Sequence, residues 1–171
     1  MSFLTLYSGG RFDYDKFGAY DITLLDVAHA LARIGRFNGH GSEFYSVAQH
    51  SVSVALFSPP HFARWGLLHD ATEAYVNDLP RPLKYREDMV PYRLLEKRVS
   101  RAIAERFNLS PLDEPEEVRE ADREVTNAEA LILGLFRAEW GEKPHIRVSK
   151  PLTPENAERR FVEMAREVGL L

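Results

Sequence analysis

The pattern of apolar and polar positions changes from alternating to helical near Asp21. Over residues 1–17, apolar side chains alternate with polar ones around a Ser-Gly-Gly bend, which predicts a short β-hairpin. From Asp21, the expected N-cap, apolar residues recur at i, i+1, i+4, i+7 and i+8. This spacing predicts an amphipathic helix that ends at Gly35.

Helical spacing continues through most of the remaining chain. A helix at about 45–57 should end at a Ser-Pro-Pro sequence. Pro60 should open the next helix, which continues past His69 to Glu73, until the two prolines of NDLPRPLKY stop it. Further helices are predicted at about 89–107, at about 115–140 and from a Thr153 cap onward. The pattern therefore predicts one all-α domain over 1–171 with a small N-terminal β-hairpin.

Composition and charge narrow the classes of partner. The 171 residues are 44% hydrophobic and 28% charged, a balance typical of soluble globular proteins. The net charge is −4, with 22 basic and 26 acidic residues mixed along the chain, so no nucleic acid polymer is expected as a partner. No segment has the length and apolarity of a membrane span or a secretory signal, so we expect a cytoplasmic protein with no membrane partner.

The chain contains no cysteine. Disulfides, thiolate catalysis and cysteine-based zinc sites are therefore excluded. Any bound metal must use histidine, aspartate or glutamate side chains. A small anionic ligand remains possible, because a few well-placed basic side chains suffice for one phosphate group.

An ionisable pair, His69 and Asp70, directly follows the apolar run GLL. Two such neighbours at the buried end of a helix are costly unless nearby groups or a metal satisfy them. Glu73 would lie one turn further along a continuous helix, on the face of His69. His50 in VAQHSVSVA and Asp122 before the most apolar helix are candidate ligands from two other helices.

The same residues could instead have a purely structural role, without a metal. A single buried histidine is more often a satisfied core residue than a ligand, and a His-Asp pair is commonly a feature of a helix end. Among the other histidines, we expect His29 to be packed or hydrogen-bonded, and His40 could line a substrate pocket. His61 and His145 should be solvated.

The ordered pattern H…HD…D resembles the HD-domain metal-dependent phosphohydrolases. The stretches FYSVAQHSVSVA and LLHDATEAYVNDLPRPLKY are similar to bacterial 5′-deoxynucleotidases and phage dATP triphosphohydrolases. The stretch DITLLDVAHALARIGRFNGHG is similar to less characterised bacterial and phage members of the same group. The resemblance covers residues 7–127. It implies an HD-domain helical bundle, a frequent homo-oligomer, with a divalent ion (Mn, Co, Fe, Zn or Mg). The metal ligands that it implies are His50, His69, Asp70 and Asp122.

The same resemblance implies roles for five further residues. Glu73 would support the nucleophilic water, and Asp78 would lie near that water and the sugar. Arg36 and Lys84 are candidate phosphate contacts. Phe37 follows Arg36 where the deoxynucleotidases are expected to carry a tryptophan against the sugar, so selection against ribose could be built differently here.

The resulting expectation is a metal-dependent phosphohydrolase of (deoxy)nucleotides, in which an activated water attacks the α-phosphorus. A dNTP triphosphohydrolase is slightly favoured, because the AHALARIGRFNGHG region is more similar to the phage enzymes. Arg81, Arg86 and Arg93 could bind the phosphates beyond the α-phosphate if they face the pocket. A 5′-deoxynucleotidase acting on dNMPs is the alternative. A nucleotide-sensing HD protein without turnover is a further one, although the presence of Glu73 and Asp78 favours catalysis. A helical protein without any metal also stays open.

Overall fold

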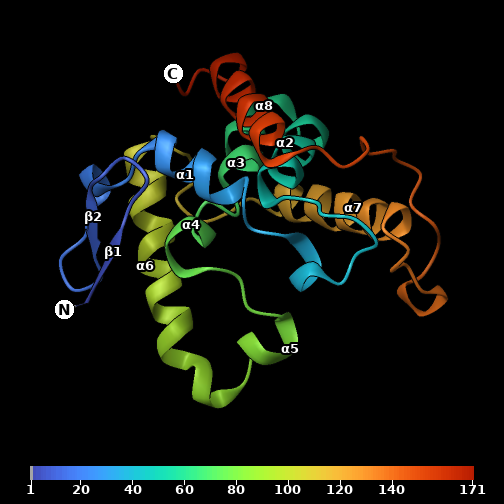
Figure 1. Ribbon diagram of the computed structural model, residues 1–171, viewed down its shortest axis with the longest axis horizontal. Helices are drawn as coiled ribbons and strands as arrows, with labels where there is room; N and C mark the ends of the chain where they lie inside the picture. Colours follow the sequence, from blue (N-terminus) through green and yellow to red (C-terminus); the bar gives the residue numbers. More distant parts are fainter. Residues whose placement is uncertain (1) are drawn as a thin grey trace.

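The computed structural model describes residues 2–171, and it begins with the predicted hairpin (Figure 1). Strands β1 (Phe3–Thr5) and β2 (Arg11–Asp13) pair antiparallel, with Leu4 opposite Phe12. The Phe12 side chain is fully buried, and its ring lies 4.4 Å from that of Tyr75. The hairpin is therefore anchored to the helical body by an aromatic side chain.

Helices make up most of the rest of the chain. They are α1 (Leu24–Leu31), α2 (Val47–Phe57), α3 (Ala63–Leu68), α4 (Glu73–Val76), α5 (Arg81–Lys84), α6 (Val90–Arg106), α7 (Glu116–Ile132) and α8 (Pro154–Glu167). Short 3₁₀ turns are η1 (Ala19–Asp21), η2 (Arg36–Gly39), η3 (Pro60–Phe62), η4 (Glu87–Met89) and η5 (Ala138–Trp140). The predicted all-α class with a small N-terminal hairpin is confirmed. Within the described residues, no helix is both long and apolar enough to span a membrane.

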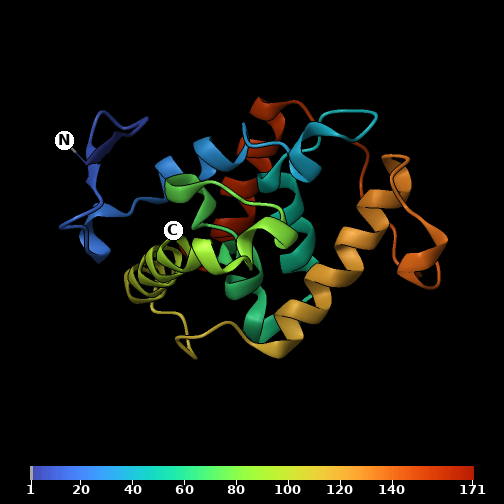
Figure 2. The ribbon, with the colours of Figure 1, turned by 90° about the horizontal axis from the view of Figure 1, so that it is seen from below.

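Helix α2 occupies the centre of the molecule, in contact with α1, α3, α7 and α8 (Figures 1 and 2). Every residue from Val47 to Ala55 is buried, including the polar Gln49 and His50. A helix surrounded on all sides must satisfy its polar groups through neighbouring elements. Gln49 does so by donating to the Lys150 carbonyl at 2.8 Å, which ties the segment before α8 to the core.

Helix α3 packs closely on α2 because of a glycine. A Cβ at Gly66 would lie only 2.8 Å from the Cα of Ala55 on α2. The bare backbone therefore allows an approach that any other residue would prevent. Since His50 is on α2 and His69 directly follows α3, this contact sets how near the two histidines come.

The short α5 and the N-terminal half of α6 extend away from the rest of the body (Figure 1), whereas the C-terminal half of α6 contributes the buried Val99 and Ile103 to the core. Lys84 Nζ on α5 donates to Glu96 Oε1 on α6 at 2.6 Å. Arg93 Nη1 donates to the carbonyls of Lys84 and Arg86 at 2.6 and 2.9 Å. These bonds hold α5 and the following turn against α6.

Two predicted helix boundaries are wrong at the first helix. The N-cap is Thr23, whose hydroxyl accepts from the Asp26 amide at 3.1 Å, whereas Asp21 belongs to η1. The helix ends at Leu31, before Gly35. Thr23 and Asp21 are both good capping residues, so the apolar spacing alone could not choose between them.

The predicted helix through His69 and Glu73 is interrupted. Helix α3 ends at Leu68, and the amide of Glu73 donates to the Asp70 carbonyl at 3.0 Å in a tight i to i−3 turn. The expected shared helical face of His69 and Glu73 is thus absent. Helix α7 also stops at Ile132 rather than near 140, because the chain turns at Gly134 with φ 74°, a conformation that glycine adopts readily.

Candidate metal centre

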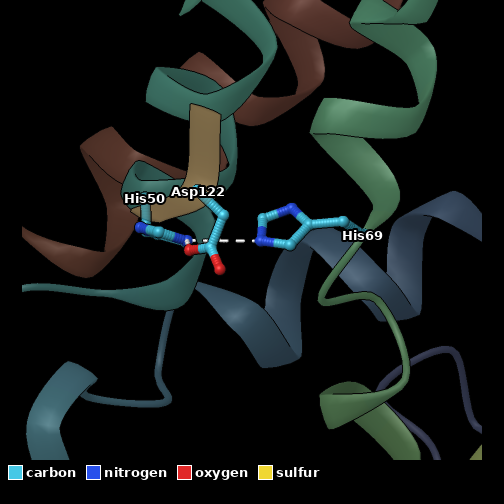
Figure 3. Close-up of side chains that lie close together, drawn as sticks. All are labelled: His50, His69 and Asp122. Atoms are coloured by element: carbon cyan, nitrogen blue, oxygen red, sulfur yellow. Dashed lines mark hydrogen bonds and ion pairs between the residues drawn. The ribbon is translucent and has the colours of Figure 1, made fainter. Parts of the chain in front are cut away.

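Three side chains from separate elements converge beside α2 (Figure 3). His50 comes from α2, His69 directly follows α3, and Asp122 comes from α7. His50 Nε2 lies 3.3 Å from His69 Nε2 and 3.1 Å from Asp122 Oδ1. The possible ligand atoms of the three residues all lie within 4.8 Å of one another, so this group could hold a metal ion.

Asp70 reaches the same point from the turn after α3. Its Oδ2 lies 3.2 Å from His69 Nε2 and 3.6 Å from His50 Nε2. The four ligands implied by the sequence resemblance therefore lie together, two imidazoles and two carboxylates. Nitrogen and oxygen donors in this number suit a first-row divalent cation and leave room for water or substrate.

The hydrogen bonds of the two Nδ1 atoms show that the Nε2 atoms of both rings point toward the cluster. His69 Nδ1 lies 2.8 Å from the Gly66 carbonyl oxygen, which can only accept, so Nδ1 carries the proton. His50 Nδ1 lies 2.9 Å from Glu129 Oε1, which is assigned as an acceptor in the same way. Both Nε2 lone pairs then face each other and two carboxylates. Of these acceptors, Asp122 Oδ1 also accepts from the Thr126 hydroxyl. A cation between the two Nε2 atoms and the carboxylates would satisfy the remaining lone pairs, and the residues present fit a metal ion.

The charges at the site also favour a cation. Burial opposes a charge on His69, but the adjacent Asp70 carboxylate outweighs it and raises the pKa of His69 to about 10. Burial would raise the pKa of Asp70, yet the His69 charge lowers it to about 2. In the metal-free protein, a proton supplies the positive charge that the carboxylates stabilise. A divalent ion would replace that proton.

Exposure differs between the two kinds of ligand. The side chains of His50 and His69 are 0% and 4% exposed, whereas those of Asp70 and Asp122 are 22% and 40% exposed. The ring nitrogens therefore form the floor of the site. Solvent therefore reaches the site from the carboxylate side.

Glu73 is buried near this cluster, at the start of α4. Burial, together with the charges of Asp70 and Asp78, raises the pKa of Glu73 well above its usual value. Its Oε2 has no hydrogen-bond partner among the described residues. A buried carboxyl oxygen left without a partner marks a place for a water or ligand atom. Asp78 lies after α4, where partial desolvation and the Asp70 charge raise its pKa.

Arg36, at the start of η2, makes most of its contacts with α7. Its Nε donates to Glu129 Oε2 at 3.2 Å and its Nη2 donates to Thr126 Oγ1 at 2.7 Å. Nη1 lies 3.8 Å from Asp70 Oδ2, on the metal side. The Phe37 ring centroid is 5.3 Å from the guanidinium carbon, and Phe37 has a left-handed φ of 54°. A left-handed φ strains an aromatic residue, and backbone strain of this kind is concentrated at functional sites.

The predicted phosphate contacts on and near α5 are held partly by protein groups. Lys84 pairs with Glu96, and the pKa of Lys84 is raised because this pair outweighs burial. Arg86 pairs with Asp88 at 3.1 Å. Arg81 is exposed, and its guanidinium lies 5.9 Å from the ring centroid of Tyr85. The roles of these side chains toward phosphate stay predictions.

The sequence pattern did not identify two residues that lie at the site, Thr126 and Glu129. Thr126 Oγ1 donates to Asp122 Oδ1 at 3.0 Å, and Glu129 is fully buried against His50. Together with Asp122 they follow the i, i+4, i+7 spacing of one helix face. A lone acid within the apolar stretch that ends α7 was the signal that could have revealed Glu129.

The other histidines lie apart from this cluster. The His29 ring stacks on Tyr7 at 3.5 Å, and its Nδ1 lies 3.2 Å from Glu158 Oε2, so its expected packed and hydrogen-bonded role is confirmed. His61 and His145 are exposed, as predicted. His40 is also exposed, at the end of η2, and its expected place in a substrate pocket stays a prediction.

Comparison with known proteins identifies relatives without naming a reaction. No protein-family model matches the chain. The chain is 38% identical to the uncharacterized protein YfdR of Escherichia coli K12 over 178 aligned residues, which cover 100% of this chain and 98% of YfdR. It is 37% identical to an uncharacterized protein of Rhodobacter capsulatus over 113 residues, 61% of this chain and 57% of that relative. By its likeness along the whole length of YfdR, this chain belongs to the YfdR family.

Proposed function

We propose that this protein is a metal-dependent phosphohydrolase of (deoxy)nucleotides. The observation that carries the proposal is the convergence of four acceptor side chains, His50, His69, Asp70 and Asp122, on one point. A purely structural ion would need no further acid nearby. Here the buried Glu73 carboxylate has an oxygen without a partner in the described chain.

A divalent ion held by these ligands would bring the pKa of a water toward about 7 and so provide hydroxide at neutral pH. Glu73 would accept a hydrogen bond from the attacking water and take its proton. Arg36 Nη1, on the Asp70 side of the site, is the guanidinium nitrogen available to a phosphate oxygen. Reaction would take place on the exposed, carboxylate side of the cluster.

The nucleotide as substrate is supported by the resemblance to HD-domain enzymes and by basic side chains near the site. The dNTP is the first substrate to test, with release of triphosphate. The contacts of Arg86 and Arg93 with protein groups make the alternative, hydrolysis of a dNMP, equally worth testing. The two reactions share the same water and metal and differ in the product.

The proposal is tested by a product assay on dNMPs, NMPs, dNTPs and NTPs with Mn²⁺ or Co²⁺. Triphosphate released from a dNTP would establish a triphosphohydrolase, and phosphate released from a dNMP would establish a 5′-nucleotidase. We expect Asp70→Ala to lose both metal and activity. No product from folded, metal-loaded protein would reject hydrolysis and favour a nucleotide-sensing role.

A further inference from the structure

The carboxylate of Glu129 lies between a metal ligand and an arginine. Its Oε1 accepts from His50 Nδ1 at 2.9 Å, and its Oε2 accepts from Arg36 Nε at 3.2 Å. The Glu129 and His50 side chains are both 0% exposed. Each carboxylate oxygen therefore has a defined partner in a region that water does not reach.

The contacts continue from Arg36 to a second ligand. Arg36 Nη2 donates to Thr126 Oγ1 at 2.7 Å, and that hydroxyl in turn donates to Asp122 Oδ1 at 3.0 Å. Since Thr126 has one hydroxyl proton, accepting from Arg36 directs this proton toward Asp122. One continuous set of hydrogen bonds thus joins His50 on α2 to Asp122 on α7.

We propose that Arg36, Thr126 and Glu129, hereafter the positioning network, orient two of the metal ligands. Glu129 keeps the proton of His50 on Nδ1 and turns Nε2 toward the metal. Arg36 holds the Glu129 carboxylate, and Thr126 fixes the rotation of Asp122. The inference rests on the metal centre of the proposed function, but it does not require that the substrate be a nucleotide.

The placement of a charged pair in the core supports a role beyond stability. Replacing a buried ion pair by apolar side chains of similar volume is often neutral or stabilising. Packing alone therefore does not need Glu129 and Arg36. A carboxylate on the outer nitrogen of a ligating histidine fixes the ring and makes it a stronger ligand, and its loss typically weakens metal binding about 10- to 100-fold.

The chain offers a matched control on α8. Glu158 also contacts a histidine and an arginine, with Oε2 3.2 Å from His29 Nδ1 and 2.7 Å from Arg33 Nη1. Neither His29 nor Arg33 belongs to the metal group. Glu158→Gln therefore removes the same kind of carboxylate without touching a ligand.

The first readout is Co²⁺ affinity, measured by competition with a chelator. Glu129→Gln should weaken binding about 10- to 100-fold, whereas Glu158→Gln should bind as the wild type does. The double variant Arg36→Met with Glu129→Leu keeps the volume and the net charge of the core. It should also bind Co²⁺ about 10- to 100-fold more weakly. Because its net charge is unchanged, this loss would be due to the missing orientation rather than to a missing negative charge.

The second readout is the ¹H NMR spectrum of the Co²⁺ protein in water, and it starts with the wild type. A hydrogen-bonded Nδ1 proton of a Co²⁺-bound histidine gives a strongly shifted signal that exchanges slowly. The wild type and Glu158→Gln should show one such signal for His50 and one for His69. The double variant should lose only the His50 signal, because His69 still donates to Gly66.

The outcomes separate this inference from the proposed function. Wild-type affinity in Glu129→Gln or in the double variant would overturn the inference, and so would a wild-type spectrum without a protected His50 signal. A wild type that binds no metal would instead reject the metal centre itself. Weakened binding in the variants, combined with no hydrolysis by the wild type, would support the positioning network and reject the phosphohydrolase.

Discussion

Two clusters of the same three residue types lie in different environments. The inner cluster is His50, Glu129 and Arg36, and the outer cluster is His29, Glu158 and Arg33. The histidine nitrogen and the carboxylate oxygen are 2.9 Å apart in the inner cluster and 3.2 Å apart in the outer one. The inner histidine and glutamate are completely buried, whereas 21% and 22% of the outer side chains are exposed.

The comparison shows that residue type and contact distance do not by themselves make a functional site. In the outer cluster, water screens the charges and the imidazole stacks on Tyr7. In the inner cluster, the Nε2 atom of His50 lies against His69 and Asp122. Because the cluster is buried, removing one partner leaves an unpaired charge and lowers stability. We therefore expect equivalent substitutions in the two clusters to have very different effects.

The largest difference is expected in metal binding. His50→Ala removes a ligand at the floor of the site and should abolish binding of Co²⁺ or Mn²⁺, whereas His29→Ala should retain it. Metal analysis of both purified variants, folded by circular dichroism, checks this. Metal retained by His50→Ala would remove the distinction between the clusters.

The next effect concerns catalysis, for which the outer cluster has no equivalent of Glu73. Glu73→Gln should keep the metal but lose the proton acceptor, which lowers kcat about 10²- to 10⁴-fold. Glu158→Gln should have the kcat of the wild type. Rates on the substrate identified by the product assay, measured at equal metal occupancy, test the role of Glu73. An unchanged rate would exclude it.

The two clusters should also differ in how much their glutamates contribute to the free energy of unfolding. Glu129→Ala leaves Arg36 and His50 buried without their partner and should lower the free energy of unfolding of the metal-free protein by about 3–5 kcal/mol. Glu158→Ala breaks a partly solvated pair and should cost about 0–1 kcal/mol. Urea denaturation with excess chelator measures both values. Equal losses would show that burial is not the deciding factor.

The smallest expected effect is that of salt on the outer pair. Raising ionic strength from about 0.1 M to about 1 M shortens the screening length from about 10 Å to about 3 Å. The coupling between Arg33 and Glu158 should then fall by a few tenths of a kcal/mol, while the coupling between Arg36 and Glu129 stays constant. Double-mutant cycles at the two ionic strengths provide the test. A larger salt effect on the inner pair would contradict its isolation from water.

The long periodic elements could be predicted from the sequence, and the breaks between them could not. Periodicity located α2, α6 and α8, and Thr153 caps α8 as expected. It missed the turn at His69, because the apolar spacing continues through it while the hydrogen bonds tighten to i to i−3. The ordered histidines and aspartates identified the ligand candidates, although the assumed helical relation of His69 to Glu73 was wrong.

The sequence by itself determined the helical class, the absence of thiol ligands and the small set of residues able to bind a metal. These follow from local spacing and side-chain chemistry. Only the tertiary structure decided that Glu129 and Arg36 join His50 rather than solvent. Their contacts cross between α2, α7 and η2, and the close packing at Gly66 brings His50 and His69 together. Such distances depend on how the helices pack, which the pattern along a single chain does not encode.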